Sequence, residues 1–126
     1  MTSILSTAAL AGETPPMAGA ELAGLLTGNT VYILVPPKTN DESTESLVPF
    51  KFGADRSAVA RLSNDTTLVG TWTIDGDQYC VDWNNGPKNS CSRLLRSSTM
   101  IRIVDAATGD PRGRIAKIVP GNPERL

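Results

Sequence analysis

The sequence predicts an all-β domain, a small antiparallel up-and-down barrel or sandwich of about eight strands with one short N-terminal helix. Short runs rich in β-branched and aromatic residues recur along the chain, and clusters of Gly, Pro, Asn and Asp separate them. Helical periodicity is confined to one short segment near the N-terminus. In a chain of 126 residues, a closed barrel or a two-sheet sandwich is favoured because closure removes exposed strand edges.

The N-terminal segment divides into three parts. Residues 1–11 resemble the end of a secretory signal. Residues 1–10 carry no charge, and Ala9-Leu10-Ala11 has the small-x-small pattern of a cleavage site. One feature does not fit a signal, because no Lys or Arg precedes the apolar run. The alternative is a short apolar helix start that packs on the domain. Residues 12–19 are rich in Pro and Gly and are expected to form a linker, and residues 20–126 form a single β domain.

The first regular element is a helix over residues 20–26. Leu22, Leu25 and Leu26 are spaced so that they form one apolar stripe, and Gly28 stands where a left-handed residue would end the helix. The runs that follow alternate or are β-branched, which predicts strands. The expected strands are residues 30–35, 47–52, 57–62, 67–74, 78–83, 90–97, 100–104 and 113–119. Pro49 lies inside the second run, which predicts an edge strand or a bulged strand there.

The two cysteines are predicted to form a disulfide. If Trp83 and Lys88 flank the turn after the fifth strand, the hairpin register places Cys80 directly opposite Cys91, where Cβ atoms lie ~4.5–5.5 Å apart. Two buried free thiols are the alternative. In the chain-entropy model this bond stabilises by roughly 3 kcal/mol. The alternation puts Tyr79 and Trp83 on the core face, and the disulfide on the outer face.

Composition excludes several classes of function. The chain has no histidine, which excludes Ser-His-Asp and Cys-His catalysis in their usual forms and the ordinary His-containing zinc sites. A net charge of −1 argues against a nucleic-acid partner. No apolar run approaches the ~18 residues that a membrane span needs. Neither a metal nor a cofactor is expected.

Two groups of residues are candidates for binding. Trp72, Tyr79 and Trp83 cluster on one hairpin and would either line a pocket for an apolar or ring-shaped ligand or fill the core. Four arginines on adjacent strands would form either a face that binds a partner or an anion, or an ordinary solvated surface. They are Arg93, Arg96, Arg102 and Arg114, of which the last three are expected on one outward face. The acidic loop 38–46 is a second candidate for partner contact.

A series of short motifs resembles a group of short exported proteins of alphaproteobacterial type whose function is uncharacterised. The series runs from Gly28-Asn29-Thr30 and Gly70-x-Trp72 through residues 79–83 and Cys91 to Gly121-Asn122-Pro123. The resemblance implies a periplasmic, disulfide-bearing, lipocalin-like β domain, and it brings no catalytic residues. A more distant likeness is to the small β-barrel inhibitors of lysozyme, as an analogy of architecture.

These observations favour a non-enzymatic periplasmic or secreted binding or accessory module, whose partner is a small molecule or an envelope protein. The first alternative is a protein-partner module, either a hydrolase inhibitor or a small subunit of an envelope complex. The second is a hydrolase or lyase that uses Asp and Arg, with Asp77 and Asp82 as the carboxylates.

Overall fold

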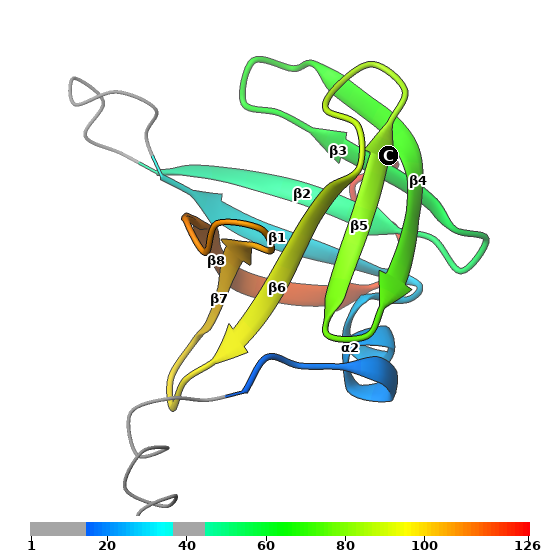
Figure 1. Cartoon of the computed structure of the whole chain (residues 1–126). Coiled ribbons are helices and arrows are strands. Elements are labelled where there is room, and N and C mark those ends of the chain that lie inside the picture. Colours follow the sequence, from blue (N-terminus) through cyan, green and yellow to red (C-terminus); the bar gives the residue numbers. More distant parts are fainter. Residues whose placement is uncertain (1–14, 37–44) are drawn as a thin grey trace, which may run out of the picture.

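A computed structural model of the chain describes residues 15–36 and 45–126, and there eight strands close into an antiparallel barrel with one helix at its end (Figure 1). Each strand pairs with the next along the chain, and the last pairs with the first. The elements are α2 Gly19–Leu26, β1 Asn29–Val35, β2 Ser46–Phe52, β3 Ser57–Arg61, β4 Thr67–Asp75, β5 Gln78–Trp83, β6 Ser90–Arg96, β7 Ile101–Asp105 and β8 Pro111–Pro120. The predicted all-β class is confirmed, and the barrel is the architecture that forms.

The strands begin and end close to the predicted positions because the alternation of apolar and polar residues follows the pleat. In β5, Tyr79, Val81 and Trp83 are buried, whereas Asp82 between them is exposed. Gly28 has a φ of +75°, the left-handed conformation expected of a residue that ends a helix. Inward-facing side chains of this kind form the barrel interior.

The strand that contains Pro49 is paired on one side along its whole length, and on the other side along only part of it. β2 pairs with β1 over all of its residues, but with β3 only from Phe50 to Phe52. Pro49 therefore lies where the β2–β3 ladder has already ended, so its missing N–H leaves no gap in that ladder. The first half of β2 and the start of the β3–β4 loop form part of the rim at the open end of the barrel.

The opposite end of the barrel is closed by α2 and the residues before it. Leu22, Leu26 and Met17 are buried in the core, and the Met17 amide donates a hydrogen bond to the Leu94 carbonyl at 3.0 Å. Met17 of the predicted linker thus packs against the barrel, and Gly19, its last residue, already belongs to α2. The predicted signal remnant 1–11 lies outside the described residues. No helix within the described ranges is long and apolar enough to cross a membrane.

Candidate ligand-binding site

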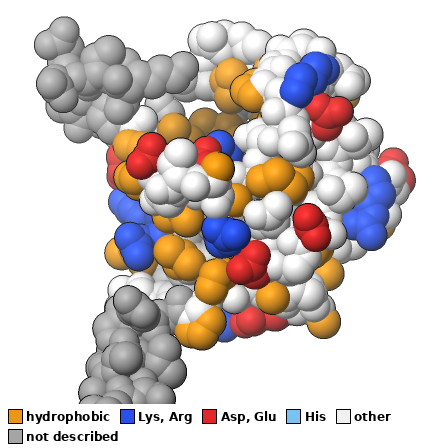
Figure 2. All heavy atoms as spheres, viewed as in Figure 1, with side chains coloured by type: hydrophobic (Ala, Val, Ile, Leu, Met, Phe, Trp, Pro, Cys, Tyr) orange, Lys and Arg blue, Asp and Glu red, His pale blue; other side chains and the backbone are white. Residues whose placement is uncertain are grey.

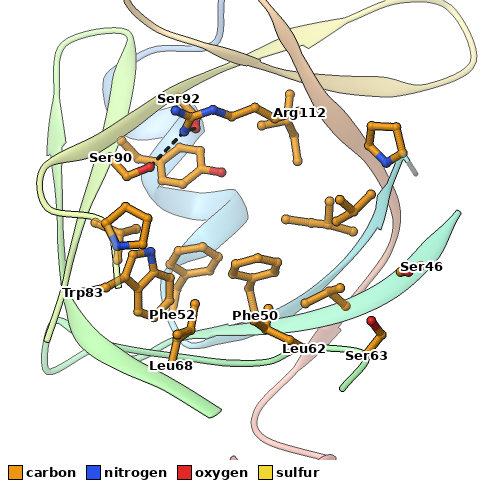
Figure 3. A pocket seen from close by; sticks show the side chains of 18 of the residues that line it. Ser46, Phe50, Phe52, Leu62, Ser63, Leu68, Trp83, Ser90, Ser92 and Arg112 are labelled. Atoms are coloured by element: carbon orange, nitrogen blue, oxygen red, sulfur yellow. Dashed lines mark hydrogen bonds between the residues drawn. The ribbon is translucent and has the colours of Figure 1, made fainter. Parts of the chain in front are cut away.

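A cavity of about 430 Å³ lies inside the barrel and opens at the end opposite α2. Its rim comes from Pro36 after β1, Ser46 at the start of β2, residues 62–64 and Pro87 in two loops, and Arg112 at the start of β8. Figure 3 shows the labelled side chains standing around a central space. Aliphatic and aromatic residues dominate the rest of the wall: Ile33, Val35, Val48, Phe50, Phe52, Leu68, Tyr79, Val81, Trp83 and Ile103.

Of the three aromatic residues predicted to line a pocket, Tyr79 and Trp83 line this cavity. Trp72 lies behind Phe52 at the closed end, with its ring centroid 5.4 Å from that of Phe52, and it is fully buried. The Trp72 indole Nε1–H donates to the Gly53 carbonyl at 3.0 Å. Trp72 is not among the residues that line the cavity, whereas Phe52 is, and so are the other two rings beside Phe52, those of Tyr79 at 5.6 Å and Phe50 at 6.4 Å. In the described structure, Trp72 is core filling and the other two are wall residues.

One side of the apolar wall carries a polar cluster around Arg112. The Arg112 Nη1 group donates hydrogen bonds to the hydroxyls of Ser90 at 3.0 Å and Ser92 at 2.8 Å, both on β6. Its Nη2 group forms an ion pair with the carboxylate of Asp105 at the end of β7. Tyr79, on the neighbouring strand β5, contacts Ser92, and burial raises the pKa of the Tyr79 hydroxyl. The cluster therefore presents hydroxyls and one guanidinium at the edge of an apolar space.

Asp105 is held mainly by its own turn. The backbone N–H groups of Thr108 and Ala107 donate to its carboxylate at 3.1 and 2.8 Å, and they are the first cause that lowers the pKa of Asp105. The charge of Arg112 lowers this pKa further. Because backbone donors stabilise the ionised form, Asp105 stays charged at neutral pH.

Arg112 reaches the cavity because β8 contains a bulge at this residue. Ile103 pairs with Gly113 and Val104 pairs with Pro111, so Arg112 is an extra residue between two paired positions. In a regular strand Arg112 and Arg114 would face the same side. The bulge changes this alternation, and Arg112 lines the interior while Arg114 binds Glu45 outside.

The bulge depends on Gly113, which has a φ of +144°. A Cβ at this position would lie 2.4 Å from the Leu34 carbonyl oxygen on β1, which is backbone and cannot swing aside. We expect Gly113→Ala to lower the free energy of unfolding by about 2 kcal/mol. Chemical denaturation measures this loss.

Gly109→Ala is the matched control for this change. Gly109 also has a positive φ, +80°, but a Cβ there would meet open space. It should cost only the conformational strain, about 1 kcal/mol. Equal losses in the two variants would contradict the role of close packing between β8 and β1.

The four arginines of the predicted partner face do not form one basic patch. Ion pairs join Arg93 to Asp77 at 3.2 Å, Arg96 to Glu21 at 2.8 Å and Arg114 to Glu45 at 2.8 Å. Arg102 and Arg114 lie directly opposite each other on β7 and β8, as predicted for neighbours on one face. Arg96, predicted to share that face, instead turns toward α2.

Charge compensation is also visible on the surface as a whole. In the view of Figure 2, blue Lys and Arg side chains are interspersed with red Asp and Glu side chains. Most of the other candidate partner segment, the loop 38–46, lies outside the described residues. The cavity is therefore a stronger basis for function than the arginine face.

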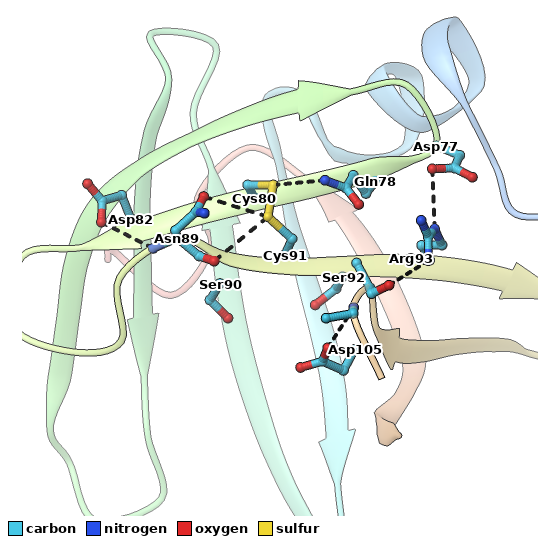
Figure 4. The surroundings of a disulfide bond; sticks show 12 residues. Asp77, Gln78, Cys80, Asp82, Asn89, Ser90, Cys91, Ser92, Arg93 and Asp105 are labelled. Carbon is cyan, nitrogen blue, oxygen red and sulfur yellow. Dashed lines mark hydrogen bonds and ion pairs between the residues drawn. A yellow bond between two sulfur atoms is a disulfide. The ribbon is translucent and has the colours of Figure 1, made fainter. Parts of the chain in front are cut away.

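The disulfide lies on the outer side of the barrel, between β5 and β6 (Figure 4). Cys80 and Cys91 are directly opposed and bonded, which confirms the predicted register and pairing. The Asp82 carboxylate accepts a hydrogen bond from the backbone N–H of Asn89 at 3.3 Å, and Asp77 forms an ion pair with Arg93. Neither carboxylate belongs to the cavity wall. Within the described part of the chain, no group of three His, Cys, Asp or Glu residues is placed to hold a metal ion.

The chain was compared with family models, curated proteins and solved structures. None of them matches it. Function is therefore inferred from the cavity and its lining, and the resemblance to short exported proteins stays a prediction.

Sequence reasoning did not single out Phe50, Phe52 or Arg112 as site residues. The two phenylalanines were visible only as members of a strand interrupted by Pro49. Arg112 precedes the residue at which the last strand was expected to begin. The signal that could have found it is Gly113, because an isolated glycine inside a strand often marks a bulge, and a bulge redirects a side chain.

Proposed function

We propose that the chain is a non-enzymatic binding module that holds a small, mainly apolar molecule inside the barrel. One observation carries this proposal: the cavity of about 430 Å³ opens at one end and is lined mostly by aliphatic and aromatic side chains. Typical small-molecule sites have volumes of roughly 300–1,000 Å³ and combine an apolar wall with a few polar groups. The Arg112 cluster supplies those polar groups.

The arrangement of the aromatic side chains supports this proposal. Trp83 and Phe50 stand in the wall with their ring centroids 6.3 Å apart, and Phe52 forms the boundary with the closed end. Phe52 and Tyr79 likewise reach each other from β2 and β5, so these rings meet across the inside of the barrel and border the cavity that remains beside them. An apolar ligand would gain roughly 0.8 kcal/mol for each methylene group that it buries against such a wall.

The proposed place of action is the periplasm or the extracellular space. The bond between Cys80 and Cys91 supports this, because disulfides persist mainly in oxidising compartments. The expected signal remnant at residues 1–11 points the same way. Alkylation of the thiols in the protein purified from its natural source tests the proposal. Two reactive thiols in the folded native protein would contradict it.

Titration with an uncharged fluorescent probe, N-phenyl-1-naphthylamine, tests the binding proposal. We expect the probe to bind the folded chain and to receive energy from Trp83, which lines the cavity. Val81→Phe should weaken binding by about tenfold or more, because its larger side chain takes the place of about two methylene groups of the ligand. Val81 is buried in the wall between Tyr79 and Trp83.

Val69→Phe is the matched control, because the same substitution then falls on the outer face, where Val69 is 43% exposed. This variant should bind the probe as the natural chain does. The proposal is wrong if the natural chain binds no probe, or if Val81→Phe and Val69→Phe bind it equally well.

A further inference from the structure

We propose that the ligand is an anionic amphiphile, whose carboxylate or similarly small oxyanion head binds at Arg112 while its apolar body occupies the cavity. This inference rests on the proposed function and adds the chemical class of the ligand. Arg112 is the one charged side chain among the described residues that line the cavity, and its side chain is 35% exposed. Every carboxylate of the described residues lies outside this lining.

The hydrogen bonds around Arg112 leave donors available. A guanidinium has five N–H groups. Two on Nη1 bind Ser90 and Ser92, and one on Nη2 binds Asp105. The Nε–H and the second Nη2–H form no hydrogen bond with a residue that the structure describes. These two groups can donate charge-assisted hydrogen bonds to an oxyanion.

The neighbouring hydroxyls add to this excess of donors. Ser90 accepts a hydrogen bond from Arg112, so its hydroxyl has its own proton left to donate, whereas the Ser92 hydroxyl is also hydrogen-bonded to Tyr79. The Tyr79 hydroxyl lies beside Ser92 and stays protonated, because burial raises its pKa. A cluster that accepts little and donates much is complementary to an anionic oxygen, and it disfavours an ammonium head.

Asp105 is the competitor that a ligand head must partly displace. Its carboxylate already accepts hydrogen bonds from the Ala107 and Thr108 amides, so it remains well solvated by its turn if Arg112 moves toward a ligand. Asp105 also lies outside the cavity lining. It therefore positions Arg112 at the rim and tunes the affinity for an anion.

Displacement of the bound uncharged probe by three ligands that share one alkyl chain and differ in the head group tests the inference. Decanoate, decanol and decyltrimethylammonium are compared at concentrations at which they are monomeric. We expect decanoate to compete about tenfold to a hundredfold better than decanol, which is the range for a charged hydrogen-bonded contact. The cationic compound should compete least. Equal competition by decanoate and decanol would overturn the inference.

Two variants with opposite expected effects separate recognition from a structural role. Arg112→Gln should abolish the preference for decanoate over decanol, measured as the ratio of the two competition constants on the same variant. Asp105→Asn should raise the affinity for decanoate by several fold, since it removes the competing carboxylate, and loss of fold alone would not produce this gain. Arg114→Gln, on the outer face of the same strand, is the control and should keep the preference.

The possible failures are distinguishable. If the natural chain binds no uncharged probe, the proposed function fails and the inference fails with it. If the probe binds but the preference for decanoate is absent, or survives in Arg112→Gln, only the inference about the head group is overturned.

Discussion

Replacing Trp72 by alanine is expected to lower the free energy of unfolding by about 3–5 kcal/mol. The side chain is fully buried at the closed end of the barrel, where its ring meets the edge of Phe52 at 5.4 Å. Its loss leaves a void beside Phe52 and leaves the Gly53 carbonyl without the Nε1–H donor at 3.0 Å. Guanidinium denaturation followed by the fluorescence of Trp83, the remaining tryptophan, measures the loss.

A second substitution divides this loss into its parts. Trp72→Phe keeps an aromatic ring in the core but removes the hydrogen bond to Gly53, so it should cost about 1–3 kcal/mol. It also reduces the contact with Arg56, whose guanidinium carbon lies 5.1 Å from the Trp72 ring centroid. If Trp72→Ala were no more harmful than Trp72→Phe, the assignment of Trp72 to the core would be wrong.

Trp72 also shows what the sequence can and cannot predict about this fold. Alternation along β5 correctly places Tyr79 and Trp83 on the inner side of the barrel, and the structure places Trp72 of β4 on that side too. It does not say how far along the barrel axis each one lies. That position depends on the stagger between strands and on where α2 packs, both of which are set by contacts between distant residues. Core filling and pocket lining therefore cannot be distinguished from the sequence alone.

The polar cluster was hidden for a different reason. An extra residue changes the side on which side chains of a strand point, and a pattern with a period of two cannot describe it. Arg112 and Arg114 look equivalent in the sequence, yet one lines the cavity and the other pairs with Glu45 outside. The pairing of Cys80 with Cys91 was predictable because the turn between them is short and contains no bulge between the paired positions.

Replacing both cysteines by serine is expected to lower the free energy of unfolding by about 3 kcal/mol. The bond joins residues 11 positions apart, and in the chain-entropy model closing such a loop restricts the unfolded chain. The native connection that it supports is short, because β5 and β6 pair only from Tyr79 to Val81. Denaturation of the double variant, compared with the natural chain in oxidised and reduced form, measures the effect.

The same change should reach the cavity. The residues paired on either side of the disulfide are Tyr79 with Ser92 and Val81 with Ser90, and all four line the cavity wall. If the bond holds these strands in register, its removal should weaken probe binding under conditions in which the barrel is still folded. A loss of stability with unchanged probe affinity would show that the β5–β6 ladder keeps its register without the bond. In that case the disulfide would act on the unfolded chain alone, as the entropic account requires, and the cavity wall would be shaped by its hydrogen bonds and packing.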